Sequence, residues 1–483
     1  MNLEGNMSYR DILLVKKIGE GQYGDVWMGK YHDYPVACKI LKRQMTDKES
    51  EKAIEELKLM AKLKHPNVVL FMGACLNDQK QICIVTEFAS RGDLRTVAPQ
   101  VKSLAKRLKL GLDVASGLAW IHANGIVHRD LKLPNLLVFE DWSVKIADFG
   151  LSLQLEEGVS INRFGGNVKY SAPEILKARY DESITIYPYS EKTDVYSFGL
   201  MFWELVTLKP LFIRPKEYKG KKGLAKYVLS GYRPAIEKNW PQSLTTILSN
   251  CWHQDPNRRP LFREIIGQWP SLTIDVLCPD KWGREVCKVL FVAQETVPFV
   301  EFMRAFSQTC FANPQTLQTK KMYRKFLSVL LCENEFDDTV SKQRFCNIVG
   351  WFSPVDKSQD CAKFFGRMKD LLTRRYFHGF LSETKAENQL KQLWDSTSNK
   401  QSYYVIRFSE SDVGAFILTF IDFNGHIQHE KILNRGGMWY VEGLAEEYDS
   451  WSKVKQAFKQ VWNIGYHLPK SPYSNLFKTG MFG

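Results

Sequence analysis

The stretch HRDLKLPN, residues 128–135, decides how the rest of this sequence is interpreted. It puts the polar side chains of Arg129, Asp130, Lys132 and Asn135 into one short loop. A carboxylate, an ammonium group and a carboxamide offer very different hydrogen-bonding and charge properties. Their presence within eight residues makes this loop the first candidate functional site.

The regions on either side of this loop differ in pattern. Up to about residue 95, short β-rich runs such as ILLVKKIGEG, DVWMGKY, YPVACKIL and QICIVTEF are bounded by Gly, Asp or Pro. One helical pattern, over residues 47–63, interrupts them. From about residue 100 to 270, helical patterns such as LAKRLKLGLDVASGLAWIHANG dominate. We therefore expect a small β-rich lobe followed by a larger α-rich lobe.

A glycine-rich loop stands near the start of the chain. IGEGQYGDV, residues 18–26, has the spacing G-x-G-x-x-G between two predicted strands. Glycines without side chains let backbone amides approach phosphate oxygens, although the same spacing also occurs in simple hairpin turns. The run VACK places Lys39 on the following strand, and Glu56 lies on the predicted helix.

Several further motifs follow in a fixed order: HRDLKLPN, then KIADFG with Asp148, then APE at 172–174. With these motifs the chain resembles the protein kinase family over residues 11–270. HPNVVLFMGAC and SEKTDVYSFGLMFWELVT resemble its tyrosine-kinase-like branch. The resemblance implies a bilobal kinase fold with ATP in the cleft, together with Mg²⁺ or, as an alternative, Mn²⁺.

The resemblance also implies roles for individual residues. Asp130 would orient the substrate hydroxyl, Lys132 would neutralise the transferring phosphate, and Glu56 would hold Lys39 on the first phosphates. Asn135 and Asp148 would ligate the metal ion. The implied ATP-binding residues are Ile18, Gly19, Glu20, Gly21, Gln22, Tyr23, Gly24, Asp25, Val26, Lys39, Thr86, Glu87, Phe88 and Ala89.

Other kinase-like residues are expected to be structural or regulatory. Glu174 and Arg259 resemble the buried ion pair that ties the activation segment to the large lobe, and Asp194 resembles the residue that braces the catalytic loop. Ser160 is a candidate activation-loop phosphorylation site, with Arg129 placed to receive the phosphate. An unmodified loop serine is the equal alternative for Ser160.

The preferred hydroxyl follows from two short motifs. Lys132 belongs to the HRDLKxxN form typical of serine/threonine kinases, whereas GGNVKYSAPE has Asn167 where those enzymes usually have threonine. An asparagine can still hydrogen-bond to Asp130 and Lys132. We therefore expect a dual-specificity kinase that prefers serine and threonine over tyrosine. A pseudokinase adaptor is the alternative, but the intact set of catalytic residues favours activity.

The C-terminal part has a second constellation. YFHGFLSETKAENQL and YYVIRFSES resemble an SH2 domain over residues 376–470, an α/β sandwich with a central antiparallel sheet. The resemblance implies phosphotyrosine binding by Arg407, Ser409, Ser411, His429 and Lys431. The alternative for Arg407 is an internal ion pair. Glu383 departs from the pattern, because many SH2 domains have an arginine at that position.

Between the two constellations, residues 271–375 contain amphipathic helical patterns such as VPFVEFMRAF. They faintly resemble the EF-hand-like helical linker that precedes the SH2 domain of STAT proteins. CENEFDDTVSKQRF lacks the glycine and the ligand spacing of a calcium loop, so a rigid spacer is expected. The expected fold is therefore multidomain α+β. Its domain order resembles the SH2-domain-bearing dual-specificity kinases of social amoebae.

Composition sets broader limits on the 483-residue chain. The formal net charge of +13 suits acidic partners such as phosphates or an anionic membrane surface, although charge alone favours the simpler interpretation of a solvated basic surface. No dense basic arm indicates nucleic-acid binding. The ten cysteines have no zinc-ligand spacing and are expected to be reduced. No signal peptide or membrane span is predicted. The family resemblance implies a cytoplasmic enzyme with protein substrates, recruited to phosphotyrosine-containing proteins at the membrane cortex.

Overall fold

The computed structural model describes residues 7–20, 24–41, 57, 60–154, 161–162, 164–211, 218, 220–238, 240–278, 280–332, 338–398, 400–409, 414–435, 438–469 and 471–473. The chain divides into two compact units, residues 1–272 and 273–483. The predicted helical segment and the predicted C-terminal domain share the second unit. The division at 11–270, 271–375 and 376–470 therefore stays a prediction.

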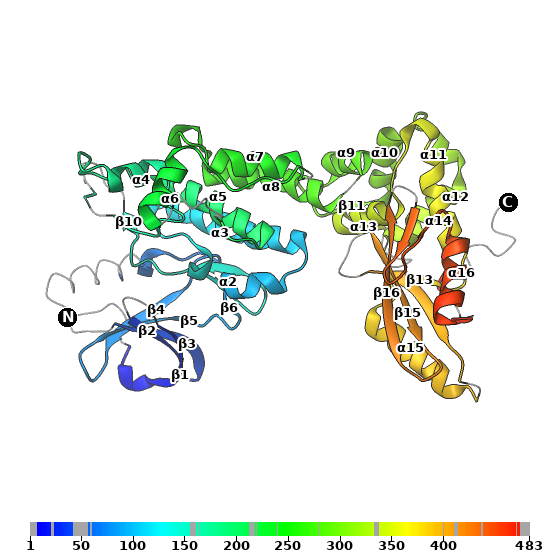
Figure 1. Cartoon of the computed structure of the whole chain (residues 1–483), viewed down its shortest axis with the longest axis horizontal. Coiled ribbons are helices and arrows are strands. Elements are labelled where there is room, and N and C mark those ends of the chain that lie inside the picture. Colours follow the sequence, from blue (N-terminus) through cyan, green and yellow to red (C-terminus); the bar gives the residue numbers. More distant parts are fainter. Residues whose placement is uncertain are drawn as a thin grey trace. The chain divides into compact units, whose positions relative to one another are not determined.

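The small lobe of the first unit is an antiparallel sheet in the order β1-β2-β3-β5-β4 (Figure 1). Its strands are β1 (Ile12–Glu20), β2 (Gly24–Tyr31), β3 (Tyr34–Leu41), β4 (Phe71–Leu76) and β5 (Ile82–Glu87). Val36 and Cys38 alternate with more exposed residues along β3 and are fully buried in the core of this lobe. Most of the predicted helix over 47–63 lies outside the described residues, but Leu57 and Met60 are buried.

Helices dominate the large lobe, as expected. They are α2 (Leu94–Val97), α3 (Leu104–Ala123), α4 (Pro173–Tyr180), α5 (Glu191–Thr207), α6 (Gly220–Leu229), α7 (Gln242–Cys251) and α8 (Phe262–Leu277). Helix α5 is buried on nearly every side, as its continuous apolar sequence requires. At Gly199 a Cβ atom would lie 2.8 Å from Cys251 Cβ, so only glycine allows α5 to pack this closely on α7.

Short strands of the large lobe carry the candidate catalytic loops. β6 (Gly92–Asp93), β8 (Leu136–Val138) and β9 (Val144–Ile146) form one small sheet, and β7 (Ile126–Val127) pairs with β10 (Leu153–Gln154). The 128–135 loop follows β7, and Asp148 follows β9. Two loops far apart in the sequence are thereby brought together.

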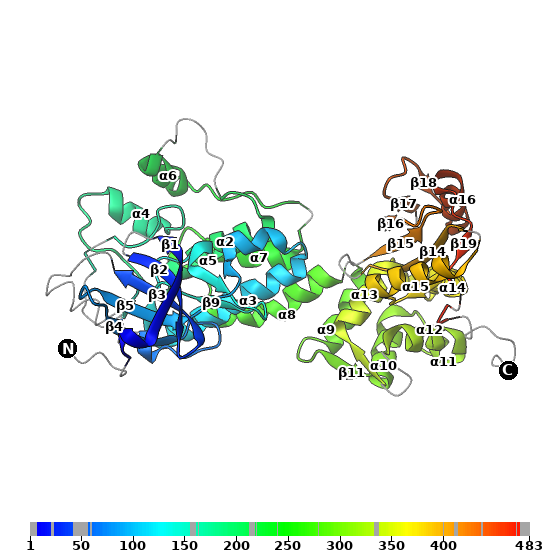
Figure 2. The ribbon, with the colours of Figure 1, turned by 90° about the horizontal axis from the view of Figure 1, so that it is seen from below.

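The second unit begins with helices. These are α9 (Lys281–Leu290), α10 (Phe299–Cys310), α11 (Thr316–Thr319), α12 (Lys321–Leu331), α13 (Lys342–Phe352) and α14 (Ala362–Leu372), shown in green and yellow in Figure 2. β11 (Thr296–Pro298) and β12 (Thr339–Ser341) pair antiparallel between them. Stacked and edge-on phenylalanine rings, including Phe302, Phe306 and Phe345, fill the interior.

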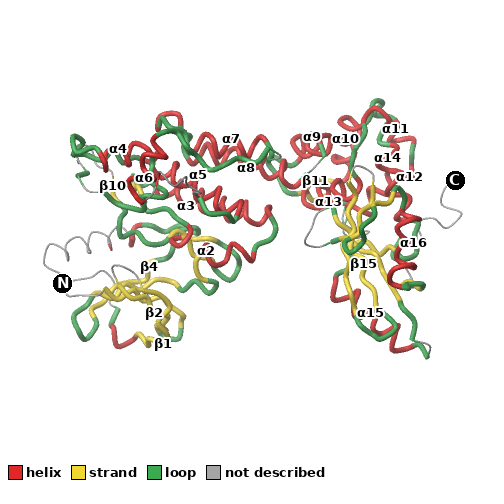
Figure 3. The backbone as a smooth tube through the Cα atoms, in the orientation of Figure 1, coloured by secondary structure: helices red, strands yellow, loops and turns green. Residues whose placement is uncertain are grey.

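A mostly antiparallel sheet follows, as predicted. Its strands are β13 (Phe377–Gly379), β14 (Tyr403–Phe408), β15 (Ala415–Ile421), β16 (Ile427–Arg435), β17 (Met438–Val441), β18 (Glu447–Tyr448) and β19 (Tyr466–His467). The strands lie between α15 (Glu383–Ser396) and α16 (Trp451–Trp462) (Figure 3). Among the described residues, no helix combines the length and apolar composition needed to cross a bilayer.

The helical segment packs directly against this sheet. The indole of Trp351 on α13 stacks on the ring of Phe408 at the end of β14, with centroids 3.6 Å apart. Phe352 contacts Phe408 and Phe416 edge-on. Trp351 is 2% exposed, so this contact is a buried part of the second unit's core.

Trp351→Ala should therefore destabilise the second unit by about 3–5 kcal/mol, because it removes a large buried ring and leaves a cavity. Urea unfolding of the full chain, followed by circular dichroism, measures the effect as a lower transition midpoint. Phe423→Ala is the matched control, since Phe423 is an aromatic residue of the same unit and is 53% exposed. Equal shifts in the two variants would contradict this account of the packing.

Candidate functional site

The polar residues of the 128–135 loop converge on the Asp130 carboxylate. Lys132 Nζ donates to Asp130 Oδ2 at 2.5 Å, and Asn135 Nδ2 donates to the same oxygen at 3.0 Å. Asn135 Nδ2 also donates to the backbone oxygen of Asp130 at 2.8 Å. The structure thus brings together three residues that sequence reasoning placed in one site. It holds the Asp130 carboxylate through one of its two oxygens.

Asp194 on α5 holds the backbone of this loop in place through hydrogen bonds. Its fully buried carboxylate accepts the N–H of His128 at 2.7 Å, the N–H of Arg129 at 2.9 Å and a hydrogen bond from His122 Nε2 at 2.9 Å. Burial alone raises the pKa of Asp194, but the hydrogen bond from His122 and the electrostatic influence of His122 and His128 outweigh burial, so the pKa is lowered. The carboxylate stays ionised and holds Arg129 at a φ of 64°.

Asp148 meets a lysine from the small lobe. Lys39 Nζ on β3 donates to Asp148 Oδ1 at 3.0 Å. Burial raises the pKa of Asp148, but attraction to the Lys39 ammonium and the hydrogen bond between them lower it below its ordinary value. Asp148 is therefore an anion at neutral pH. Glu56, the predicted partner of Lys39, lies outside the described residues.

These residues fit a divalent cation by their chemistry. The hydrogen bonds of the Asn135 carboxamide use Nδ2, and within the described part of the chain none uses Oδ1. The ion pair of Asp148 likewise uses Oδ1 and leaves Oδ2. A carboxamide oxygen and a carboxylate oxygen are the hard ligands that Mg²⁺ prefers. The predicted metal-binding pair is thus chemically suited to its role.

The glycine-rich loop is described only at its two ends. Gly19 pairs with Val26 and Glu20 with Asp25 between β1 and β2, and Ile18 precedes them on β1. At Gly24, a Cβ atom would lie 2.4 Å from the backbone oxygen of Ile40, so close strand packing itself requires glycine here. Gly21, Gln22 and Tyr23 lie outside the described residues.

The segment that joins the two lobes begins at the end of β5. Thr86 and Glu87 are the last residues of this strand, and Phe88 and the buried Ala89 follow. Glu87 is tied down by its side chain, which accepts from the N–H of Leu70 at 2.7 Å and from Lys145 Nζ on β9 at 2.8 and 2.9 Å. The link from Glu87 to Lys145 joins this segment to the large lobe, and no sequence motif marked it.

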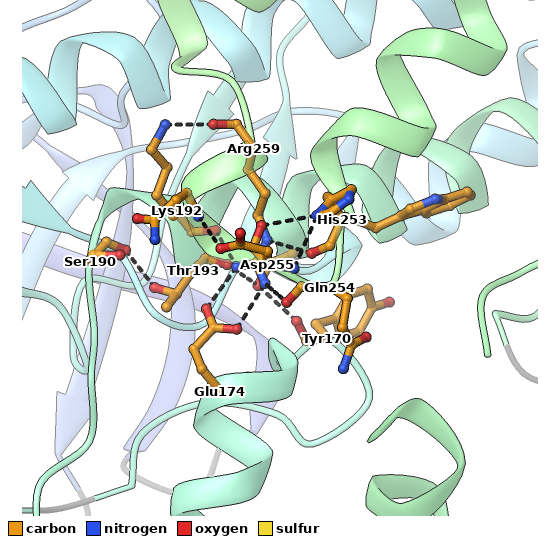
Figure 4. Close-up of polar contacts among 12 residues, drawn as sticks. Tyr170, Glu174, Ser190, Lys192, Thr193, His253, Gln254, Asp255 and Arg259 are labelled. Atoms are coloured by element: carbon orange, nitrogen blue, oxygen red, sulfur yellow. Dashed lines mark hydrogen bonds and ion pairs between the residues drawn. The ribbon is translucent and has the colours of Figure 1, made fainter. Parts of the chain in front are cut away.

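The buried ion pair expected between Glu174 and Arg259 is present (Figure 4). Arg259 Nη1 donates to Glu174 Oε1 at 2.7 Å and Nη2 donates to Oε2 at 2.8 Å. The remaining Arg259 donors reach the backbone oxygens of His253, Lys192 and Gln254. All the polar capacity of a buried guanidinium is therefore satisfied, which anchors the start of α4.

Arg129 has contacts that the sequence did not indicate. Its Nε donates to the backbone oxygen of Leu151 at 2.5 Å, and its guanidinium lies 5.0 Å from the ring centroid of Tyr189. The Tyr189 hydroxyl donates to the Gly165 oxygen and accepts from the Gly165 N–H. Ser160, the predicted phosphorylation site, lies outside the described residues.

The predicted hydrogen bonds of Asn167 were wrong. Asn167 Oδ1 accepts the N–H of Lys169 at 3.0 Å, and no hydrogen bond joins Asn167 to Asp130 or Lys132 among the residues that the structure describes. Asn167 is exposed and forms a local turn, in which its short side chain bonds to the backbone two residues ahead.

The second candidate site centres on Arg407 of β14, which is 1% exposed. Its Nε donates to Thr419 Oγ1 at 3.1 Å, and its Nη2 donates to Glu383 Oε2 at 2.5 Å. His429 Nδ1 lies 3.0 Å from Thr419 Oγ1. The structure therefore brings Arg407 and His429 together through Thr419, which sequence reasoning missed.

For the other residues predicted at this site, the structure gives positions but fewer contacts. Ser409, which is buried, directly follows β14 close to Arg407, and Lys431 lies on β16 two residues beyond His429. Ser411 lies outside the described residues. The ion pair of Arg407 with Glu383 is the internal pairing that the sequence analysis held as an alternative, and Glu383 is the residue that departed from the expected pattern.

Comparison with known proteins gives two family matches. Residues 12–269 match the model described as "protein tyrosine and serine/threonine kinase", and residues 376–457 match the SH2 domain model. The dual specificity protein kinase shkA of Dictyostelium discoideum is 29% identical over 463 residues, which cover 90% of this chain and 84% of that protein. Its relative shkC is 30% identical over 446 residues, covering 88% and 85%. The serine/threonine-protein kinase STY17 of Arabidopsis thaliana is 37% identical over 278 residues, covering 56% of this chain and 46% of STY17.

Proposed function

Because the chain belongs to the protein tyrosine and serine/threonine kinase family, we propose that it transfers phosphate from ATP to protein hydroxyl groups at Asp130, with serine and threonine preferred over tyrosine. The observation that carries this proposal is the convergence of Lys132 and Asn135 on one oxygen of Asp130. A carboxylate held this way keeps its second oxygen for a substrate hydroxyl.

Each residue of the chain has a task in this proposal. Asp130 accepts the proton of the substrate hydroxyl and orients its oxygen toward the phosphate, while Lys132 offsets the negative charge of the transferring group. Lys39 would hold the other phosphates, and Asn135 and Asp148 would hold Mg²⁺, with Mn²⁺ as an alternative. The bound cation supplies charge neutralisation of the phosphate oxygens. Residues of the glycine-rich loop, 18–26, and of the segment 86–89 would bind the nucleotide.

We expect phosphoserine and phosphothreonine to dominate the products, with phosphotyrosine as a minor product. Lys132, which lies beside the hydroxyl-orienting carboxylate, is typical of serine/threonine kinases, and the relatives include both dual-specificity and serine/threonine kinases. Phosphoamino-acid analysis of the autophosphorylated full chain is the experiment that tests this. The Asp130→Asn protein, prepared in parallel, controls for contaminating kinases. A product that is overwhelmingly phosphotyrosine would contradict the preference.

The C-terminal unit supplies targeting in this proposal. Arg407, supported by Ser409, Ser411, His429 and Lys431, binds the phosphate of phosphotyrosine-containing proteins. This recruitment brings the kinase to the membrane cortex from the cytoplasm, and the net charge of +13 adds weak attraction to anionic lipids. Ser160 remains a proposed site of activating phosphorylation.

Arg407→Lys should weaken binding of a phosphotyrosine peptide about thirtyfold or more, since a lysine cannot replace the planar fork of two hydrogen bonds. Fluorescence anisotropy of a labelled peptide with the full chain measures this loss. Arg375→Lys is the matched control, because Arg375 is an exposed arginine outside the sheet. Equal affinities of the Arg407→Lys protein and the parent would remove Arg407 from the binding site.

A further inference from the structure

The Arg407 guanidinium already holds an anion, the carboxylate of Glu383. Nη2 of Arg407 donates to Glu383 Oε2 at 2.5 Å, and the Arg407 side chain is 1% exposed while that of Glu383 is 56% exposed. The second hydrogen bond of the guanidinium, from Nε to Thr419 Oγ1, points into the domain. One terminal nitrogen that would serve a phosphate is therefore used within the chain.

A second carboxylate, that of Glu387, lies close to Glu383. The Arg407 Nε donates to Thr419 Oγ1, so the Thr419 hydroxyl keeps its own proton for His429 Nδ1, 3.0 Å away. His429 Nε2 then carries the ring proton and donates it to Glu387 Oε1 at 3.0 Å. The side chains of Glu383, Glu387 and His429 lie within 4.8 Å of one another. Glu383 and Glu387 are one turn apart on α15, so one edge of this helix places two carboxylates beside Arg407 and His429.

We propose that Glu383 is a built-in competitor that occupies the phosphate-binding guanidinium of Arg407. A phosphotyrosine ligand then binds only by displacing Glu383 from Arg407. This inference rests on the proposed recognition of phosphotyrosine by Arg407. It makes Glu383 an affinity-determining residue of that site. It also explains why a glutamate stands where many related domains have a second arginine.

The geometry allows this displacement. Glu383 is the first residue of α15 and more than half exposed, so its carboxylate can turn into water, where the positive end of the helix dipole still favours it. Arg407 is buried, so most ligand-free molecules keep Glu383 paired with it and only a minority have the guanidinium open to a phosphate. A dianion with three oxygens makes more charge-assisted hydrogen bonds than a single carboxylate. Phosphate therefore displaces Glu383 from Arg407, but its net affinity is lower than it would be without this competition.

The cost of displacement is the same for every anion. The apparent dissociation constant equals the intrinsic one divided by the fraction of molecules with an open pocket. If the pairing with Glu383 leaves the site open in roughly one molecule in six, phosphate binding is weakened about sixfold, and repulsion from the displaced carboxylate weakens it further. Anions with weak intrinsic affinity, such as sulfate or acidic peptides, consequently bind too weakly to occupy the site.

Binding of a phosphotyrosine peptide to full-length variants tests this inference. Glu383→Gln should tighten binding about tenfold, because a neutral carboxamide neither competes for Arg407 as strongly nor repels the phosphate. Asp395→Asn is the matched control, since it removes one negative charge from the far end of the same helix, about 18 Å away. Its affinity should equal that of the parent. Phenyl phosphate serves as a second probe that makes no contacts outside the pocket.

A second variant guards against loss of folding. Glu383→Asp keeps the charge at the helix N-terminus but shortens the side chain, so its affinity should lie between those of the parent and Glu383→Gln. Affinities of Glu383→Gln and Glu383→Asp within twofold of the parent, with binding still lost in Arg407→Lys, would overturn the inference and leave phosphotyrosine recognition intact. No binding of either probe by the parent or by any Glu383 variant would overturn the proposed recognition itself, and the inference with it.

Discussion

Asp130→Asn should lower the rate of phosphoryl transfer by about a thousandfold, while ATP binding stays near that of the parent. The carboxamide has nearly the same shape as the carboxylate, but it cannot take up the proton of the attacking hydroxyl. Asn135 Nδ2, which donates to Asp130 Oδ2 at 3.0 Å, can still meet an amide oxygen at that position. Initial rates at saturating ATP, together with nucleotide titration, separate the loss of chemistry from a loss of binding.

The control for this experiment is Asp181→Asn, which changes a partly exposed aspartate of the same lobe whose carboxylate, among the described residues, accepts hydrogen bonds only from Ser183. That variant should keep the full rate. Equal, background-level phosphorylation by the parent and by Asp130→Asn would mean that the kinase unit is a pseudokinase and that the chain acts as a phosphotyrosine-binding adaptor.

Glu174→Ala should destabilise the first unit by about 3–5 kcal/mol. The Arg259 side chain is 0% exposed and would lose both hydrogen bonds of its bidentate pair, which leaves a buried charge without its counter-ion. Denaturant unfolding of the full chain shows the effect as a lower midpoint. Because Glu174 lies in the first turn of α4, and the pair is expected to tie the activation segment to the large lobe, the rate of phosphate transfer should fall as well.

Glu237→Ala is the matched control for this prediction. Glu237 pairs with Lys209 at 2.7 Å, but the two side chains are 45% and 60% exposed. Exposed pairs contribute only about 0–1 kcal/mol, so the midpoint should barely move. A shift in Glu174→Ala no larger than that in Glu237→Ala would show that the Arg259 pair does not anchor the lobe.

The motifs that handle phosphate could be recognised from sequence because the chemistry requires fixed residue types within short loops. Asp130, Lys132 and Asn135 lie within six positions, and the structure brings their side chains together as expected. The buried pair of Glu174 with Arg259 spans 85 positions, but both residues belong to recognisable motifs. The bilobal fold and the C-terminal sheet follow from the same motifs.

Contacts without a motif could not be predicted. The pairing of Glu383 with Arg407 depends on how α15 packs on β14 and β15, and neither residue type nor spacing reveals that packing. The stacking of Trp351 on Phe408 joins two segments that differ in sequence pattern, and no motif in either segment indicates this contact. Asn167 was expected to hydrogen-bond to Asp130 by analogy with a threonine, but its side chain instead accepts the N–H of Lys169 in a local turn.

The central claim is that two separable sites act on phosphate. Asp130 performs phosphate transfer, and Arg407 determines to which phosphotyrosine-containing proteins the enzyme is recruited. The most direct test of this claim compares initial rates of the parent and Arg407→Lys on one serine peptide, offered free in solution or tethered beside phosphotyrosine on a scaffold. The account predicts equal rates on the free peptide and a faster rate for the parent on the tethered one, because local concentration then depends on Arg407. Loss of activity by Arg407→Lys on the free peptide would contradict it, since Arg407 would then be needed for transfer itself.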